Sequence, residues 1–192
     1  MALVSTILTN SAQPISDNLA TSSAVTVILF CNYNTPSNVD PALGRQWLEV
    51  YAVKNGDSAG TANKLMHRVP LDAGDTFTFS TERIVLAPGD RVWANTLGQG
   101  VASVIMGGAG SSYTNGDPVY FSAPDFPEGV TATGYALVTG GQVTGVYITE
   151  AGSGYINSPS IDFTQSGDGL ASGTAVLQNT SQVTCTTSYV LI

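Results

Sequence analysis

The sequence predicts an all-β protein: an antiparallel β-sandwich of jelly-roll type, joined to a second, smaller β domain. Short runs of β-branched and aromatic residues recur along the chain, each bounded by Gly, Pro, Asn or Asp. No long stretch shows the apolar periodicity of an amphipathic helix. Of the 192 residues, 10% are charged and 43% are hydrophobic, a balance that favours a folded domain and excludes coiled coils and disordered chains.

The first hundred residues contain the runs expected to form the sandwich. We expect strands at residues 4–8, 25–31, 47–54, 64–71, 76–81, 91–94 and 101–106. Residues 70–75 and 86–90 predict two related turns, because each pairs an apolar residue with a Gly-Asp step that permits a tight reversal. A short helical turn is expected near residues 41–46. The large side chains expected in the core are Trp47, Trp93, Phe77 and Phe79, with Trp93 also a candidate for an interface.

A different pattern begins near Gly107, where two related units follow one another. Residues 108–121 and 150–163 share a Gly-Ser-x-Tyr start, and Tyr113 and Tyr155 lie 42 positions apart. Each unit continues into a strand of small residues, at 129–137 and at 169–177. Gly140-Gly141 predicts a tight hairpin between the units. We therefore predict a tandem pair of β units of roughly 40 residues each, which pack on one another.

The last segment, residues 182–192, breaks this repeat and alternates as a sandwich strand does. We expect it to return to the first domain and complete its sheet, with Val183, Cys185 and Thr187 on one face. The alternative is a final strand that belongs to the repeat domain. The preferred interpretation gives a discontinuous sandwich domain at 1–104 and 181–192, with the repeat domain at 105–180 inserted in it.

The charge distribution excludes several classes of partner. The net charge is −8, and no basic residue follows Arg91, whereas six acidic residues do. A nucleic-acid surface needs Lys or Arg to neutralise phosphates, and an anionic membrane attracts the same residues. The longest apolar run, residues 24–31, is too short to span a bilayer, and residues 1–10 lack the features of a signal peptide. We expect no nucleic-acid partner and no membrane association.

Residues that could perform chemistry do not form a recognisable set. His67 is the one histidine, no G-x-S-x-G motif supplies a nucleophile, and a pairing of His67 with Cys31 has no supporting motif. Asp72, Asp75 and Asp90 lie in expected turns, where capping is favoured over calcium binding. We therefore expect no enzyme activity, and no catalytic, cofactor-binding or metal-ligating residues. Cys31 and Cys185 are interpreted as small apolar core residues, with a disulfide left open.

Tyrosines are the remaining candidates for a binding site. Exposed tyrosine rings could stack on sugars, and the candidates are Tyr113, Tyr120, Tyr147 and Tyr155. Packing in the core of the repeats is the favoured interpretation for Tyr113 and Tyr155. The residues that would form a binding site are therefore not identified by the sequence.

The paired Gly-Ser-x-Tyr…Pro…Phe units, with their small-residue strands and Gly-Gly hairpin, resemble a module of structural proteins of tailed bacteriophages, particularly cyanophages. Residues 27–32, 69–77 and 86–90 resemble the first domain of such proteins, and residues 183–192 their last strand. The resemblance implies a non-enzymatic virion protein, attached to the capsid, neck or tail as a decoration or fibre-associated component. It also implies a homo-oligomer that binds other virion proteins. The alternative function is a receptor- or glycan-binding adhesin module on the particle surface, with a host surface glycan as partner.

Overall fold

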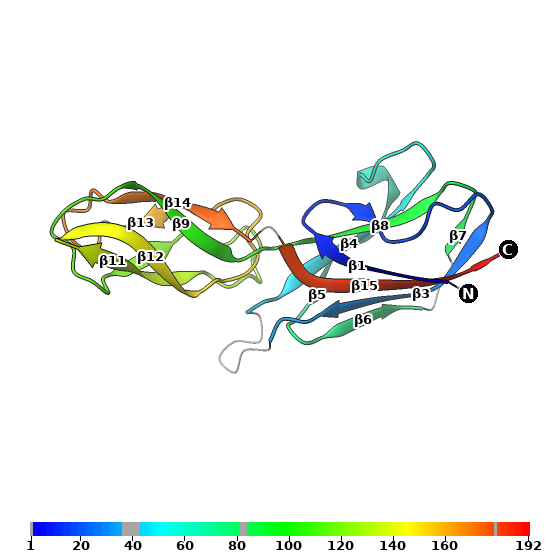
Figure 1. The fold of residues 1–192 in the computed structure, drawn as a ribbon, viewed down its shortest axis with the longest axis horizontal. Coiled ribbons are helices and arrows are strands. Elements are labelled where there is room, and N and C mark those ends of the chain that lie inside the picture. The colour runs from blue at the N-terminus through cyan, green and yellow to red at the C-terminus, as the bar shows by residue number, and fades with distance from the viewer. Residues whose placement is uncertain (1, 36–42, 81–83, 179) are drawn as a thin grey trace. The chain divides into compact units, whose positions relative to one another are not determined.

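The computed structural model describes residues 2–35, 43–80, 84–178 and 180–192, and it is all-β with antiparallel sheets (Figure 1). Two compact units divide the chain. The first contains residues 2–35, 45–97 and 180–192 among those described, and the second contains residues 98–178 with 43–44. The change of unit thus falls at residues 97/98, whereas the sequence pattern predicted it at 104/105. The described residues include no helix with the length and apolar character needed to cross a membrane.

One sheet of the first unit has five strands and includes the C-terminal segment. β1 (Ala2–Thr9), β15 (Thr180–Leu191), β3 (Ser23–Asn32) and β6 (Thr76–Phe79) are neighbours in that order, and β7 (Ile84–Leu86) also pairs with β3. Figure 1 shows β15 in red between β1 and β3. The C-terminal strand therefore completes the sheet of the first unit, as expected, because its alternating pattern matches a half-buried strand.

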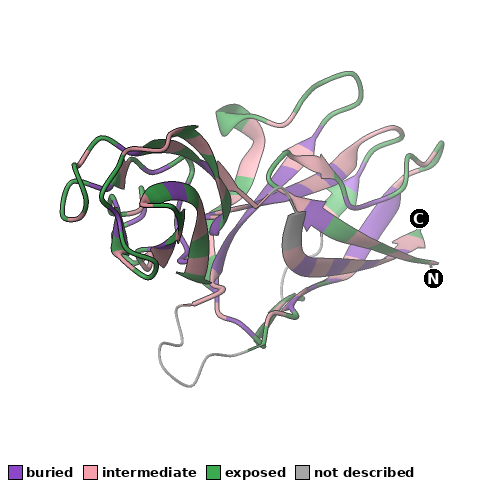
Figure 2. Cartoon of the chain, turned by 60° about the vertical axis from the view of Figure 1, so that its left-hand side comes forward, coloured by how far each residue is buried: buried purple, intermediate pink, exposed green. Residues whose placement is uncertain are grey.

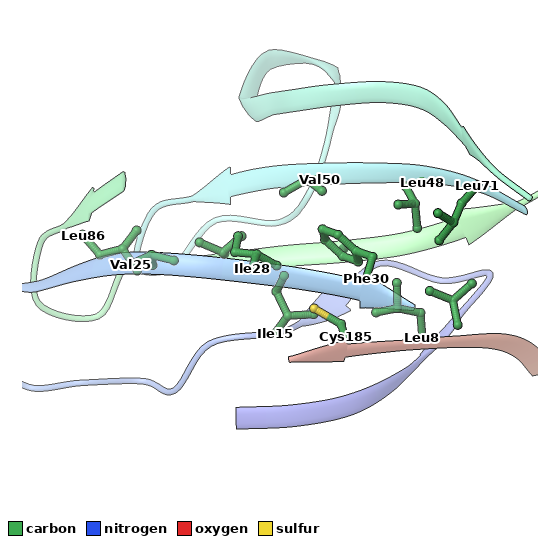
Figure 3. Packing of buried hydrophobic residues seen from close by; sticks show 13 residues of the cluster. Leu8, Ile15, Val25, Ile28, Phe30, Leu48, Val50, Leu71, Leu86 and Cys185 are labelled. Carbon is green, nitrogen blue, oxygen red and sulfur yellow. The ribbon is translucent and has the colours of Figure 1, made fainter. Parts of the chain in front are cut away.

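The other sheet of the first unit has four strands, in the order β2 (Gln13–Pro14), β8 (Arg91–Leu97), β4 (Gln46–Val53) and β5 (Lys64–Leu71). Residues from both sheets form one apolar core. Figure 3 shows Ile28 and Phe30 of β3 opposite Leu48 and Val50 of β4. The unit is thus a sandwich of two antiparallel sheets, and each apolar face is removed from water by the other.

The four large side chains expected in this core occupy different environments. Phe77 and Phe79 pack against the core cluster. Trp47 is buried, but it points to the opposite face of β4 from Leu48 and lies outside that cluster, so its predicted place was wrong. Both faces of β4 are buried, as its burial pattern shows. Trp93 is half-buried.

The two predicted turns are confirmed. The Asp75 N–H donates to the Asp72 carbonyl at 3.1 Å, and the Asp90 N–H donates to the Ala87 carbonyl at 3.0 Å. Gly74 and Gly89 precede these donors with φ of 83° and 84°, a conformation that other residues rarely adopt. The one described helix is a 3-10 turn, η1 (Thr61–Asn63), which the sequence did not predict. Of the expected turn at 41–46, residues 41 and 42 lie outside the described residues and Gln46 begins β4.

The second unit contains two antiparallel sheets. One has the order β12 (Gln142–Glu150), β11 (Thr133–Thr139), β10 (Pro118–Phe121) and β13 (Ile161–Asp162), and the other pairs β14 (Ser172–Leu177) with β9 (Val101–Gly108). Along β10, the buried Val119 and Phe121 alternate with the exposed Pro118 and Tyr120; Figure 2 shows buried, intermediate and exposed residues along the chain. With the strand that precedes it, each sequence unit supplies three strands: β9, β10 and β11, then β12, β13 and β14. The first strand of each unit pairs with the last strand of the other, so neither unit has a complete sheet without its partner.

Two buried tyrosines also connect the two sequence units, through hydrogen bonds of their hydroxyl groups. The Tyr155 hydroxyl accepts the Ala132 N–H at 2.9 Å and donates to the Ser122 carbonyl at 3.0 Å. The Tyr113 hydroxyl accepts the Ala171 N–H at 3.2 Å and donates to the Phe163 carbonyl at 3.4 Å. Each tyrosine therefore bonds to the backbone of the other sequence unit, and both rings lie in the core of the domain. This confirms core packing as the role of these two residues.

Candidate binding surfaces

A polar cluster on the four-stranded sheet contains the chain's histidine. Glu49 is buried, and its Oε2 accepts the Tyr51 hydroxyl at 2.6 Å. Its Oε1 lies 2.6 Å from Lys64 Nζ and 2.8 Å from His67 Nδ1. A buried carboxylate is tolerated when donors surround it, and here three side chains from β4 and β5 do so.

A β-bulge places His67 in this cluster. Leu48 pairs with Val69 and Val50 with Met66, so Glu49 is opposed by both His67 and Arg68. Arg68 has a φ of 53°, the left-handed conformation that often accompanies an inserted residue. The His67 side chain is 60% exposed, beside a hollow lined by Thr61, Lys64, Leu65 and Met66. His67 is thus a strand histidine whose ring has side-chain partners in Glu49 and Lys64.

We expect Glu49→Gln to destabilise the first unit at neutral pH by about 1–3 kcal/mol, because Lys64 and Tyr51 lose their charged acceptor. Burial raises the pKa of Glu49, but the hydrogen bonds from Lys64, Tyr51 and His67 outweigh burial and hold the pKa below its ordinary value of 4.5. A depressed folded-state pKa contributes stability above the unfolded-state pKa, and this stability is lost as the pH falls. Thermal unfolding from pH 7 to pH 3 should therefore show the two proteins converging in acid. A constant difference across that range would contradict this role of Glu49.

The other residues considered for chemistry are kept apart. His67 is on β5 of the four-stranded sheet, whereas Cys31 is on β3 of the five-stranded sheet, so no thiol–imidazole pair forms. Asp72 forms an ion pair with Arg45, and Asp90 accepts the Asn55 N–H at 3.0 Å. Both aspartates thus bond to a neighbouring segment, whereas the sequence predicted that they cap their own turns. Within the described ranges, no group of His, Cys, Asp and Glu side chains is arranged to hold a metal ion.

The two cysteines lie on opposite faces of the five-stranded sheet. Cys185 is in the core, where burial raises the pKa of its thiol to about 12. Cys31 is half-buried, its β-strand position placing it on the outer face, and both thiols are free. The interpretation as core residues is therefore confirmed for Cys185 and wrong for Cys31. The reason is alternation along β3: Phe30 points into the core beside Cys185, so its neighbour Cys31 points away from it.

The outer face of the five-stranded sheet has an unusual composition. None of the residues in β1, β3, β6, β7 and β15 carries a charge. We call this outward-facing surface the charge-free face; it consists of Leu3, Ser5, Ile7, Val27, Leu29, Cys31, Thr76, Thr78, Thr184, Thr186 and Ser188. Leu3 is 69% exposed and Ile7 is 54% exposed. Exposed aliphatic side chains on an uncharged sheet are typical of a surface that another protein covers.

β1 forms one edge of this sheet, and part of its backbone faces outward from that edge. The Ile7 carbonyl accepts the Gln13 side-chain amide at 2.6 Å, so it points away from β15. Because successive residues of a strand direct their N–H and C=O groups to alternate sides, those of Leu3 and Ser5 also point away from β15. Natural edge strands are commonly guarded by Lys, Pro or a bulge, and residues 2–6 of β1 contain none of these. The edge is therefore suited to pairing with a further strand.

Two of the candidate tyrosines are exposed on the second unit. Tyr120 is 50% exposed and Tyr147 is 53% exposed, in contrast to the buried Tyr113 and Tyr155. Tyr147 stacks on Tyr135, with ring centroids 5.1 Å apart and an interplanar angle of 26°. Tyr135 was not among the candidates from the sequence, because an unbroken hairpin at Gly140-Gly141 would pair it with Val146; the bulge between Leu137 and Val138 pairs it with Tyr147 instead.

Comparison of the chain with protein-family models, with curated proteins and with solved structures found no match. The likeness to phage structural proteins therefore stays a prediction from the sequence. Function is inferred below from the surfaces of the two units.

Proposed function

We propose that this protein is a non-enzymatic structural component of a larger particle, in which copies of the chain associate through the charge-free face and the edge of β1. The observation that carries the proposal is an entirely uncharged five-stranded sheet with exposed aliphatic residues at its edge. The resemblance noted in the sequence indicates a tailed-phage virion as that particle, with other virion proteins as further partners. Such proteins work by forming repeated contacts between identical subunits.

The pattern of β1 suits a two-fold contact between two copies. If two β1 strands pair antiparallel about Ser5, Leu3 of each copy lies opposite Ile7 of the other. The contact then contains two equivalent Leu3–Ile7 pairs. The outward-pointing N–H and C=O groups of Ser5 would pair with those of the second Ser5, and the two five-stranded sheets would become one continuous sheet. The same strand thus supplies both halves of the contact, as a two-fold interface requires.

The double variant Leu3→Lys/Ile7→Lys tests this proposal. Two lysines facing two lysines across the contact repel one another, so we expect association to weaken at least tenfold, or by about 1.4 kcal/mol. Light scattering after size exclusion at micromolar concentration should then give the mass of one chain, 19.8 kDa, where the unmodified protein gives at least twice that mass.

Leu65→Lys is the matched control, because Leu65 is a 47% exposed leucine on β5, an edge strand of the other sheet. It should leave the mass unchanged. A double-lysine variant with the same mass as the unmodified oligomer would contradict the proposed interface, and an unmodified protein that is monomeric would contradict self-association itself.

The alternative function, a glycan-binding module displayed on a particle, is favoured by a different observation. Tyr120 and Tyr147 are exposed and belong to the second unit, whereas the charge-free face belongs to the first. The two functions are compatible, since one surface would join subunits and the other would meet a ligand.

A further inference from the structure

Three tyrosines occupy one face of the four-stranded sheet of the second unit. Tyr147, Tyr135 and Tyr120 lie on the adjacent strands β12, β11 and β10. Tyr135 pairs directly with Tyr147, and Tyr120 pairs with Thr133, which is two residues before Tyr135 and so on its side of the sheet. We call these three side chains the tyrosine face. With neighbouring strands ~4.8 Å apart, the face extends over about 10 Å between the outer two strands.

Polar groups accompany the rings. Thr133 and Thr149 lie on the same side, their hydroxyl oxygens 2.6 Å apart. Asp162 of β13 is the cross-strand neighbour of Tyr120, and its Oδ1 accepts both the N–H and the hydroxyl of Thr164. The carboxylate is therefore held in place at the end of the row. Among the described residues, no hydrogen bond engages the hydroxyls of Tyr120, Tyr135 or Tyr147.

The opposite side of this sheet explains why the rings remain at the surface. Val119 of β10 and Ala136 of β11 are buried in the core of the second unit, and Val146 of β12 packs against that core. The tyrosines alternate with these core residues and so must point outward. Core packing therefore fixes the strands that present the rings. A rigid sheet presenting aromatic side chains loses little conformational freedom when a ligand is bound.

Flat aromatic rings with free hydroxyls suit a ligand that has an apolar face and hydrogen-bonding groups around its rim. Nucleobases and pyranose sugars both meet this description. The second unit has no Lys, Arg or His, while Asp117, Asp125, Glu128, Glu150, Asp162 and Asp168 all belong to it. Phosphates would thus be repelled with no cation to neutralise them, which disfavours nucleic acid. An uncharged sugar meets no such penalty.

We propose that the tyrosine face binds a neutral saccharide, with the rings of Tyr120 and Tyr147 against the apolar faces of the sugars and Asp162 accepting hydrogen bonds from their hydroxyls. This proposal rests on the alternative function given above, a glycan-binding module, and it specifies the site and the class of ligand. It does not depend on the β1 contact, because every residue invoked belongs to the second unit.

Binding of the full chain to a panel of soluble neutral polysaccharides tests the site. The panel contains polymers of glucose, galactose, mannose and N-acetylglucosamine, and binding is read as retardation in native gels that contain each polymer. We expect at least one polymer to retard the unmodified protein, and Tyr120→Ala/Tyr147→Ala to lower its affinity at least tenfold. Tyr33→Ala is the matched control, since Tyr33 is 48% exposed but lies in the first unit, and it should bind like the unmodified protein.

Three results would overturn the assignment: no retardation by any polymer of the panel, binding that survives the double alanine variant, or binding lost equally in Tyr33→Ala. Stacking of a single-stranded oligothymidine on the face, lost in the double variant, would assign it to nucleobases instead. Light scattering on the same variants distinguishes saccharide binding by the tyrosine face from the proposed association of copies through β1. A tyrosine variant that loses sugar binding should keep the mass of the unmodified protein, whereas a changed mass would assign the face to a contact between subunits.

Discussion

A chain that ends at Gln178 is expected to lose the folded first unit and to keep the second. The shortened chain lacks β15, which lies between β1 and β3 and supplies Val183 and Cys185 to the core. Without it, β1 has no neighbour in its sheet, and the apolar faces of both sheets are exposed to water. Tryptophan fluorescence reports on the first unit alone, because Trp47 and Trp93 both belong to it. The emission of the shortened chain should shift to that of exposed tryptophan.

A chain that ends at Val190 is the matched control, because it removes only Leu191 and Ile192, which are 63% and 64% exposed. Its emission should match that of the full chain. The converse variant replaces Gly98–Gln178 with a short Gly-Ser linker, which is feasible because the Gln178 N–H donates to the Gly100 carbonyl at 3.0 Å. It should retain buried tryptophans. Native emission from the chain that ends at Gln178 would contradict the discontinuous first unit.

Tyr155→Ala is expected to destabilise the second unit by about 3–5 kcal/mol, which is a large part of the stability of a small domain. The ring is 1% exposed, and its hydroxyl bonds to the backbone of two other segments. Tyr155→Phe keeps the ring and removes only the hydroxyl, leaving the buried Ala132 N–H without its acceptor. We expect a cost of about 1–3 kcal/mol for that variant.

Urea unfolding followed by far-UV circular dichroism measures both Tyr155 variants, with tryptophan emission showing whether the first unit remains folded. Tyr113→Phe provides the matched comparison, since the hydroxyl bonds of Tyr113 are longer, at 3.2 and 3.4 Å, and its removal should cost less. A Tyr155→Phe variant as stable as the unmodified protein would contradict the linking role of the hydroxyl. Equal losses of stability in Tyr155→Phe and Tyr113→Phe would contradict the expectation that the Tyr155 hydroxyl contributes more.

The strands of the first unit were predictable because their signals are local. β5 (Lys64–Leu71) agrees with its predicted bounds, and turns centred on Gly74 and Gly89 follow from dipeptides that favour a reversal. The place of β15 was predictable from its alternation and from the end of the repeat. β2 and β7, of two and three residues, were missed because so few residues give no periodic signal.

Features that depend on pairing between distant strands were not predictable. The bulge at His67 and Arg68 reflects the register of β5 on β4, and the stacking of Tyr135 on Tyr147 reflects a bulge between β11 and β12. The exchange of strands between the two repeat units was also not evident, although it explains why two copies suffice for a closed domain. The tyrosine face could be seen in part, since Tyr120 and Tyr147 were candidates, but their common face required the sheet order.

Association of copies of the chain through β1 is tested most directly by a disulfide across the proposed two-fold axis. Ser5→Cys, in a Cys31→Ser background, places two thiols opposite one another, where a hydrogen-bonded antiparallel pair has a Cα separation of about 5.5 Å. Disulfides form at such separations. Mild oxidation followed by a non-reducing gel should give a covalent dimer, whereas Leu65→Cys in the same background should give little. Equal cross-linking of the two proteins, or none at Ser5→Cys, would contradict the proposed assembly.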